Sequence, residues 1–385
     1  MSQSQAAAPA GYTKYFIPGD EDLLLEVLDE ISADAEDGPM HAEIAVTAWT
    51  PNTTLYWDHW EDGYDYDPND PGNTADEIVT LTNTGDAQLF TSFGIPLNRT
   101  VDVGNAANIN QCDQSDSNDS NDQPCYDGRD ILYVAGGAVT VTRAGWDEDR
   151  GTVLSVAWEV YPVRPQLIQY ILPFGEDLAL NDGLDDFERV YAFVQATADG
   201  TQVQVDFNDD GTYDAIDFNR DGDCTDANDG TSVTLAQGQV LLLSRDSDGN
   251  GGSGCTVADD SLNTGTTLLA SRTVQVQYII GDENSSYEIR GLSAFPRGFW
   301  DDEYYAPVDE PAADDQTDIY LYNPHDEPLT INYETRSTAS SFTIAPKTTA
   351  SFRAATGGDL EEDSAVFLKE SIVAVAACLL GYLYH

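Results

Sequence analysis

The sequence predicts an all-β protein built from tandem antiparallel β-sandwich units of an immunoglobulin-like or jelly-roll-like kind. Long acidic loops and one short N-terminal helix complete the expected architecture. Two observations support it. Segments rich in Val, Ile, Thr, Tyr and Phe alternate with turn signals every 8–12 residues or so, a pattern typical of sandwiches. A unit containing several such segments also recurs three times along the 385 residues.

Three shared features mark the repeated unit. Each copy begins with the motif Tyr-x-x-Pro, at 15–18, 170–173 and 304–307. Each continues with two strand-like segments around a polar turn, beginning at His41, Glu188 and Thr317. Each closes with a strand, a short turn and a strand, at 130–144, 266–280 and 365–379. The expected units are therefore 12–168, 169–302 and 303–385.

The third unit looks incomplete at the sequence level. In the first two units a further strand-like segment follows the closing pair, VLSVAWEVYP and then YEIRGLSAFP, whereas the third unit reaches His385 without one. We expect further sequence or a partner strand to complete this unit, because an open strand edge is a template for pairing.

One helix is expected, over Asp20–Ser32. Leu24, Val27, Leu28 and Ile31 recur at helical spacing on one face, and Asp20 is a suitable N-cap. The pattern indicates a packing helix that covers part of a sheet.

The charge balance excludes some classes of partner. The chain has 69 acidic and 16 basic residues, a formal net charge of −53. Such a chain repels nucleic acid and anionic membrane surfaces. With 41% hydrophobic residues it is not a disordered acidic tail. Adaptation to high salt and binding of divalent cations both explain the acidity. The apolar run near the C-terminus, about 14 residues, is too short to span a bilayer.

Four of the five cysteines bracket polar stretches. Cys112 with Cys125, and Cys224 with Cys255, are expected to form loop-closing disulfides, which indicates an extracellular or cell-surface location. Cys378 lies in an apolar run, and a buried free thiol is expected there.

The acidic stretch 206–229 suggests a calcium site. One register, D-x-N-x-D-G-x-x-D, contains Asp206, Asn208, Asp210 and Asp214. A second register, eleven residues later, contains Asp217, Asn219, Asp221 and Asp226. Alternate oxygen ligands around a glycine turn suit Ca²⁺, and Asp217 stands where an EF-hand loop has Glu. The doubled spacing resembles calcium loops of thrombospondin type 3 or dockerin repeats. A solvated acidic loop is the alternative.

A second unusual segment is LYWDHWEDGYDYD, residues 55–67. Strand alternation would put Trp57 and Trp60 on opposite faces, with a turn at Asp62-Gly63. Either one row of aromatic rings faces the core, or Trp57, Trp60 and Tyr64 stack on a sugar. One hairpin does not supply the two opposed carboxyl groups of a glycosidase.

The phrases YAFVQATADGTQVQV, VTLAQGQVLLL and TGTTLLASRTVQVQYI resemble repeats in the N-terminal region of IgG-Fc-binding protein and similar bacterial surface proteins. The resemblance is best over 190–281. It implies a secreted or surface β-protein with interaction roles, not an enzyme, and no functional residue carries over from it.

The expected function is therefore that of an extracellular, calcium-stabilised structural or adhesive protein, a segment of a larger surface assembly. Its partners would be other subunits or surface components, including copies of itself joined by strand edges. The alternative is a carbohydrate-binding module, or less favourably a glycan-active enzyme, that uses the Trp57–Tyr66 segment. No Walker loop, G-x-S-x-G or HExxH motif is present.

Overall fold

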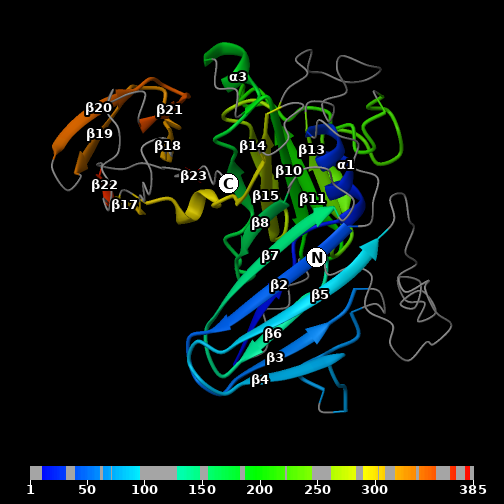
Figure 1. Ribbon diagram of the computed structural model, residues 1–385. Coiled ribbons are helices and arrows are strands. Elements are labelled where there is room, and N and C mark those ends of the chain that lie inside the picture. Colours follow the sequence, from blue (N-terminus) through cyan, green and yellow to red (C-terminus); the bar gives the residue numbers. More distant parts are fainter. Residues whose placement is uncertain are drawn as a thin grey trace.

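The computed structural model (Figure 1) is all-β, with small antiparallel sheets and two short α-helices among its described residues. This confirms the all-β part of the expected fold class. The structure describes residues 11–31, 40–60, 64–70, 72–95, 128–147, 155–182, 187–221, 223–244, 262–282, 289–301, 303–307, 317–334, 338–352, 365–369 and 378–381.

The first unit has two four-stranded sheets, ordered β1-β6-β3-β4 and β5-β2-β7-β8. The strands are β1 Tyr12–Phe16, β2 Met40–Ala48, β3 Thr53–Asp58, β4 Glu77–Leu81, β5 Ala87–Ile95, β6 Ile131–Ala135, β7 Val139–Asp147 and β8 Ser155–Val160. Alternate residues of β8 are exposed and buried, as period-two patterning requires.

The second unit repeats this topology. Its sheets are ordered β9-β14-β11-β12 and β13-β10-β15-β16, which is the first unit's order with eight added to every strand number. The strands are β9 Gln169–Ile171, β10 Arg189–Ala196, β11 Thr201–Asp206, β12 Val233–Leu235, β13 Val240–Leu243, β14 Thr267–Ala270, β15 Val274–Gly281 and β16 Ile289–Ser293.

The third unit keeps the same order in its sheets β17-β22-β19-β20 and β21-β18-β23. Its strands are β17 Glu303–Pro307, β18 Thr317–Tyr322, β19 Leu329–Glu334, β20 Ala339–Ile344, β21 Thr349–Ser351, β22 Ala365–Lys369 and β23 Cys378–Gly381. Strands β8 and β16 have no counterpart in the described part of this unit, where the sequence pattern also lacks one.

Within each of the first two units, one core joins both sheets. In the first unit Ile44 and Val46 on β2 share a buried cluster with Leu55 on β3 and Val134 on β6. The corresponding strands of the second unit build a larger core in the same way. The small sheets as a whole have a propeller-like arrangement rather than that of a clear sandwich. Their pairing into tandem sandwiches therefore stays a prediction.

Helix α1, Glu21–Ile31, belongs to the first unit but packs on the second. The four apolar residues expected on one face are all fully buried. They contact Tyr191 and Phe193 on β10 and Val240 on β13, so the helix covers the outer face of a sheet of the next unit (Figure 1). Asp20 accepts a hydrogen bond from the Leu23 amide at 3.4 Å, as a capping residue does.

A second joint connects the second and third units. Phe174 and Phe187 flank helix α3, Asp177–Asp182, and the ring centroid of Phe187 lies 5.0 Å from that of Tyr320 on β18. Lys347 adds an ion pair with Asp209 at 2.8 Å. In both joints, a segment near the start of one unit packs against aromatic side chains on the second strand of the next unit.

No helix in the described ranges is long and apolar enough to cross a membrane.

Candidate functional site

The two unusual segments occupy the same place in the repeat. Strand β3 ends at Asp58 and strand β11 ends at Asp206, both buried, and each insertion follows directly. The spacing D-x-x-x-D-G begins at Asp58, at Asp206 and again at Asp217. This shared spacing is a signal that links the aromatic segment to the acidic loops, although only the repeat alignment makes it visible.

In the first acidic loop, buried carboxylates hold the backbone turn. Oδ1 of Asp206 accepts the Asp210 amide at 3.1 Å, and Oδ2 accepts the Gly211 amide at 2.8 Å. Oδ2 of Asp214 accepts the Phe207 amide at 2.9 Å. Gly211 has a φ of 87°, which explains the glycine in the pattern.

The second loop repeats this arrangement. Asp217 is fully buried, and its Oδ1 accepts the Asp221 amide at 3.3 Å. The amide Nδ2 of Asn219 donates to Asp221 at 3.1 Å and to Asp226 at 3.4 Å. Asp209 and Arg220, the fourth residues of the two loops, have φ values of 54° and 57°. The two registers therefore share side-chain roles and backbone shape.

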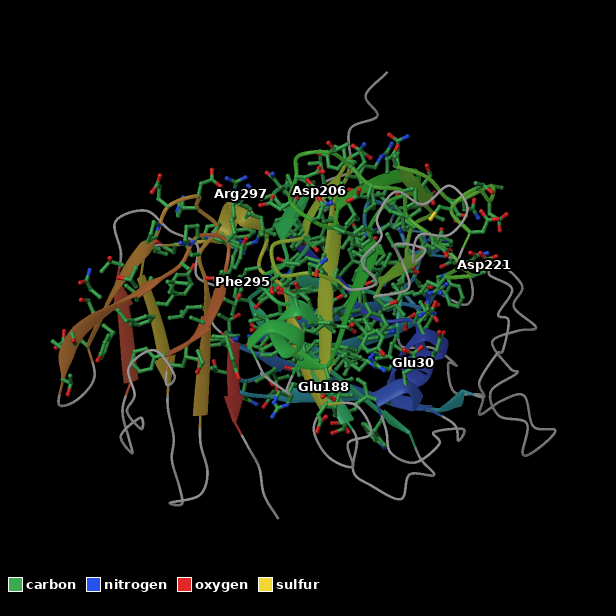
Figure 2. The ribbon with its side chains drawn as sticks, turned by 90° about the horizontal axis from the view of Figure 1, so that it is seen from above. Glu30, Glu188, Asp206, Asp221, Phe295 and Arg297 are labelled. Carbon is green, nitrogen blue, oxygen red and sulfur yellow. The ribbon has the colours of Figure 1, made fainter. Side chains whose placement is uncertain are left out.

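The predicted calcium ligands lie in two separate loops, one for each register. Figure 2 shows Asp206 and Asp221 well apart, on different parts of the acidic segment. Among the described residues, no group of three or more His, Cys, Asp or Glu side chains is placed to hold a metal ion. The donor set of carboxylates and one or more amides per loop fits Ca²⁺ chemically.

The cysteine predictions are tested only in small part. Cys224 is buried in the acidic segment, while Cys112, Cys125 and Cys255 lie outside the described residues. Cys378 starts strand β23. The two disulfides therefore stay predictions.

The aromatic segment differs from the expected hairpin. Strand β3 lies between β4 and β6, and its register with β4 runs from Thr53 opposite Leu81 to Trp57 opposite Glu77. The expected turn at Asp62-Gly63 lies outside the described residues. Position 57 faces the core on this strand, and the indole is fully buried. Trp57 is therefore a core residue, because the alternation of β3 directs it between the sheets.

Trp60 and Tyr64 lie instead at the joint between the first and second units. Trp60 is 7% exposed, and the Arg129 guanidinium lies 4.4 Å from its ring centroid, a cation–π contact. The Tyr64 hydroxyl donates to the Arg129 carbonyl at 2.7 Å. Arg129 also forms an ion pair with Asp20 at the start of α1. These contacts fix the segment against the helix.

Asp130 anchors the aromatic segment. Its fully buried carboxylate accepts hydrogen bonds from Trp57 Nε1 and the Trp60 amide, both at 2.7 Å, and lies 2.9 Å from His59 Nδ1. Burial raises the pKa of Asp130, and His59 with the hydrogen-bond donors opposes that rise. Sequence reasoning missed this residue because it lies 70 positions from Trp60, directly before strand β6.

The two insertions face each other across a cavity between the first and second units. The cavity has a volume of about 860 Å³. Trp60 and Tyr64 line it from the first unit, and Phe218, Asn219 and Arg220 line it from the second acidic loop. The fold thus brings together two segments about 150 residues apart that the sequence treats as separate candidates.

No protein-family model, curated protein or solved structure matches the chain. The function is therefore argued from the repeat, its loops and the cavity.

Proposed function

We propose that this chain is an extracellular, calcium-stabilised structural protein, a segment of a surface or extracellular assembly. Each unit is proposed to be a sandwich-like pair of antiparallel sheets. The observation that carries the proposal is the strand order, which recurs in three successive units whose joints bury apolar side chains. Repeated units that contact only their neighbours are typical of scaffolds that span distance.

The joints give the array a direction. On β10, Tyr191 and Phe193 point outward from their unit and are covered by helix α1 of the preceding one. Counting back from the strand ends, the first-unit counterparts on β2 are Glu43 and Ala45, which are partly exposed. This pattern supports a defined order of units rather than random packing.

Calcium is proposed to stabilise the second unit through the loops 206–217 and 217–228. Asp217 belongs to both registers, as the last position of one loop and the first of the next. The Asp217 carboxylate is fully buried, and the whole chain carries a net charge of −53. A cation that neutralised this carboxylate would therefore favour the folded loop. The expected disulfide at Cys224 would restrict the same segment and fits an oxidising compartment.

The experiment is a calcium titration of thermal unfolding after exhaustive chelation. Ca²⁺ at about 100 times its Kd should stabilise the protein by about 2.7 kcal/mol. For a unit of this size the melting temperature then rises by roughly 5–10 °C. The salt concentration is held constant so that general screening of the acidic surface does not contribute.

The matched variants are Asp217→Asn and Asp326→Asn, which remove the same charge. Asp217→Asn should abolish most of the calcium-induced rise, because both loops lose a ligand. Asp326→Asn should leave the rise intact, because the Asp326 side chain lies in the third unit and is 93% exposed. A melting temperature that does not respond to millimolar Ca²⁺ contradicts the calcium proposal, as does an equal response in both variants.

The scaffold proposal has its own test in solution scattering. A linear array with fixed joints gives one maximum dimension that does not change between low and moderate protein concentration. Higher-order assembly through strand edges would instead increase with concentration. A broad distribution of dimensions for the single chain would contradict fixed joints.

A further inference from the structure

The cavity between the first two units has the composition of a ligand site rather than of a packing defect. Voids left by imperfect packing are small and apolar, whereas this one has a volume of about 860 Å³ and is lined by seven polar or charged residues with three aromatic ones. Sites for small molecules are of this size and often lie where two domains meet. The cavity is lined by the insertions that follow β3 and β11. Proteins often place binding residues on loops that a rigid scaffold positions in this way.

The charges around the cavity cancel. Asp20 and Asp199 are balanced by Arg129 and Arg220 among the lining residues. Each of these charges already has a partner: Asp20 pairs with Arg129, Arg220 pairs with Glu26, and Asp199 accepts the Gln237 amide at 2.9 Å. A lining with no excess of positive charge, in a chain of net charge −53, disfavours phosphate-bearing ligands.

Hydrogen-bonding capacity and ring surface remain for a neutral ligand. Among the lining residues, Asn219 is exposed and Gln237 is half-buried. Their side-chain amides can each donate to, and accept from, a ligand hydroxyl group. Tyr64 and Phe218 are half-buried, so parts of their rings face the cavity from opposite units. A ligand that matches such a lining has adjacent hydroxyl groups for the polar side chains and apolar C–H faces for the aromatic rings.

We propose that the cavity between the first and second units binds a neutral saccharide of two or three sugar rings. Tyr64 and Phe218 would contact the apolar faces of the rings, while Asn219 and Gln237 would hydrogen-bond the hydroxyl groups. This goes beyond the proposed scaffold function, which requires no ligand. It differs from the sequence expectation in its residues, because Trp57 is in the core and Phe218 belongs to the acidic loop.

The test uses the full chain and a panel of cellobiose, maltose, lactose and N,N′-diacetylchitobiose, measured by saturation-transfer NMR and calorimetry. Binding of at least one of these sugars in the micromolar to low millimolar range is expected. Ala236→Trp should weaken it at least about tenfold, because Ala236 is exposed at the lining and the new indole would occupy part of the cavity. Gln237→Ala should also weaken it, while its backbone contact with Asp199 is kept.

The control is Ala339→Trp, the same substitution at an exposed alanine in the third unit. It should bind as the wild type does. Absence of saturable binding to every sugar at about 10 mM overturns the proposal, as does equal weakening by Ala236→Trp and Ala339→Trp. Melting temperatures measured on the same samples with Ca²⁺ and with chelator report on the calcium proposal separately, so either proposal can fail alone.

Discussion

Trp158 makes the joint between the first two units testable. It lies on β8 of the first unit, is 2% exposed, and its ring centroid lies 6.1 Å from that of Phe193 on β10. Its Nε1 donates to the Tyr278 carbonyl on β15 of the second unit at 2.8 Å. One side chain therefore provides both apolar burial and a hydrogen bond across the joint.

Replacement of this residue should uncouple the units. Trp158→Ala removes a buried indole, which costs about 3–5 kcal/mol, including the cavity that it leaves. Trp158→Phe keeps most of the ring but loses the N–H, so its cost should be nearer 1 kcal/mol. Urea denaturation at fixed Ca²⁺ and salt measures these free energies of unfolding. Calorimetry should show one transition in the wild type dividing into two in Trp158→Ala.

The matched control is Trp49→Ala. Trp49 is 65% exposed, although its Nε1 also makes a hydrogen bond, to Thr140 Oγ1 at 2.7 Å. Trp49→Ala should lower the free energy of unfolding by no more than about 1 kcal/mol, because the indole buries little apolar area in the folded protein. If Trp158→Ala costs less than about 1 kcal/mol, or no more than Trp49→Ala, the inter-unit packing does not hold the joint and the reasoning fails.

Two further predictions concern buried charges of the first unit. Asp130→Asn should lower the free energy of unfolding by about 2–4 kcal/mol and change the near-ultraviolet circular dichroism of the tryptophans, because it disrupts a buried carboxylate network; a variant indistinguishable from wild type would contradict the anchoring role. Lys14 has its pKa lowered from 10.5 to about 8, mainly by burial and against the attraction of Asp58. Between about pH 8 and 10.5 the unfolded chain therefore binds more protons there, and the free energy of unfolding should rise with pH, by less than about 1.4 kcal/mol per unit. Lys14→Met should lack this rise, and equal pH slopes in the two proteins would refute the assignment.

The sequence was most informative where local patterns decide structure. The helix over Asp20–Ser32 formed within one residue of its expected bounds, because Leu24, Val27, Leu28 and Ile31 can be buried together only at helical spacing. The three units share one strand order because similar strand and turn patterns were repeated along the chain. The described third unit lacks a counterpart of β8 and β16, and the sequence pattern lacks a matching segment there as well.

The aromatic segment shows where local patterns fail. Alternation along residues 55–67 predicts a hairpin at Asp62-Gly63, yet β3 pairs with β4 beyond the insertion. Pairing depends on which segment offers matching apolar residues in the right register, and that is a property of the whole sheet. The buried carboxylate of Asp130 likewise comes from a distant part of the chain, directly before β6, so no local pattern could connect it with Trp57.

The sequence by itself determined the all-β class, the threefold repeat, the packing helix and the acidity of the inserted loops. These follow from side-chain periodicity and composition, which act over a few residues at a time. Only the tertiary structure decided that helix α1 covers the neighbouring unit, that Trp57 is in the core, and that Tyr64 and Phe218 face one cavity. The physical reason is that unit-to-unit packing depends on which apolar faces remain uncovered after each sheet has formed.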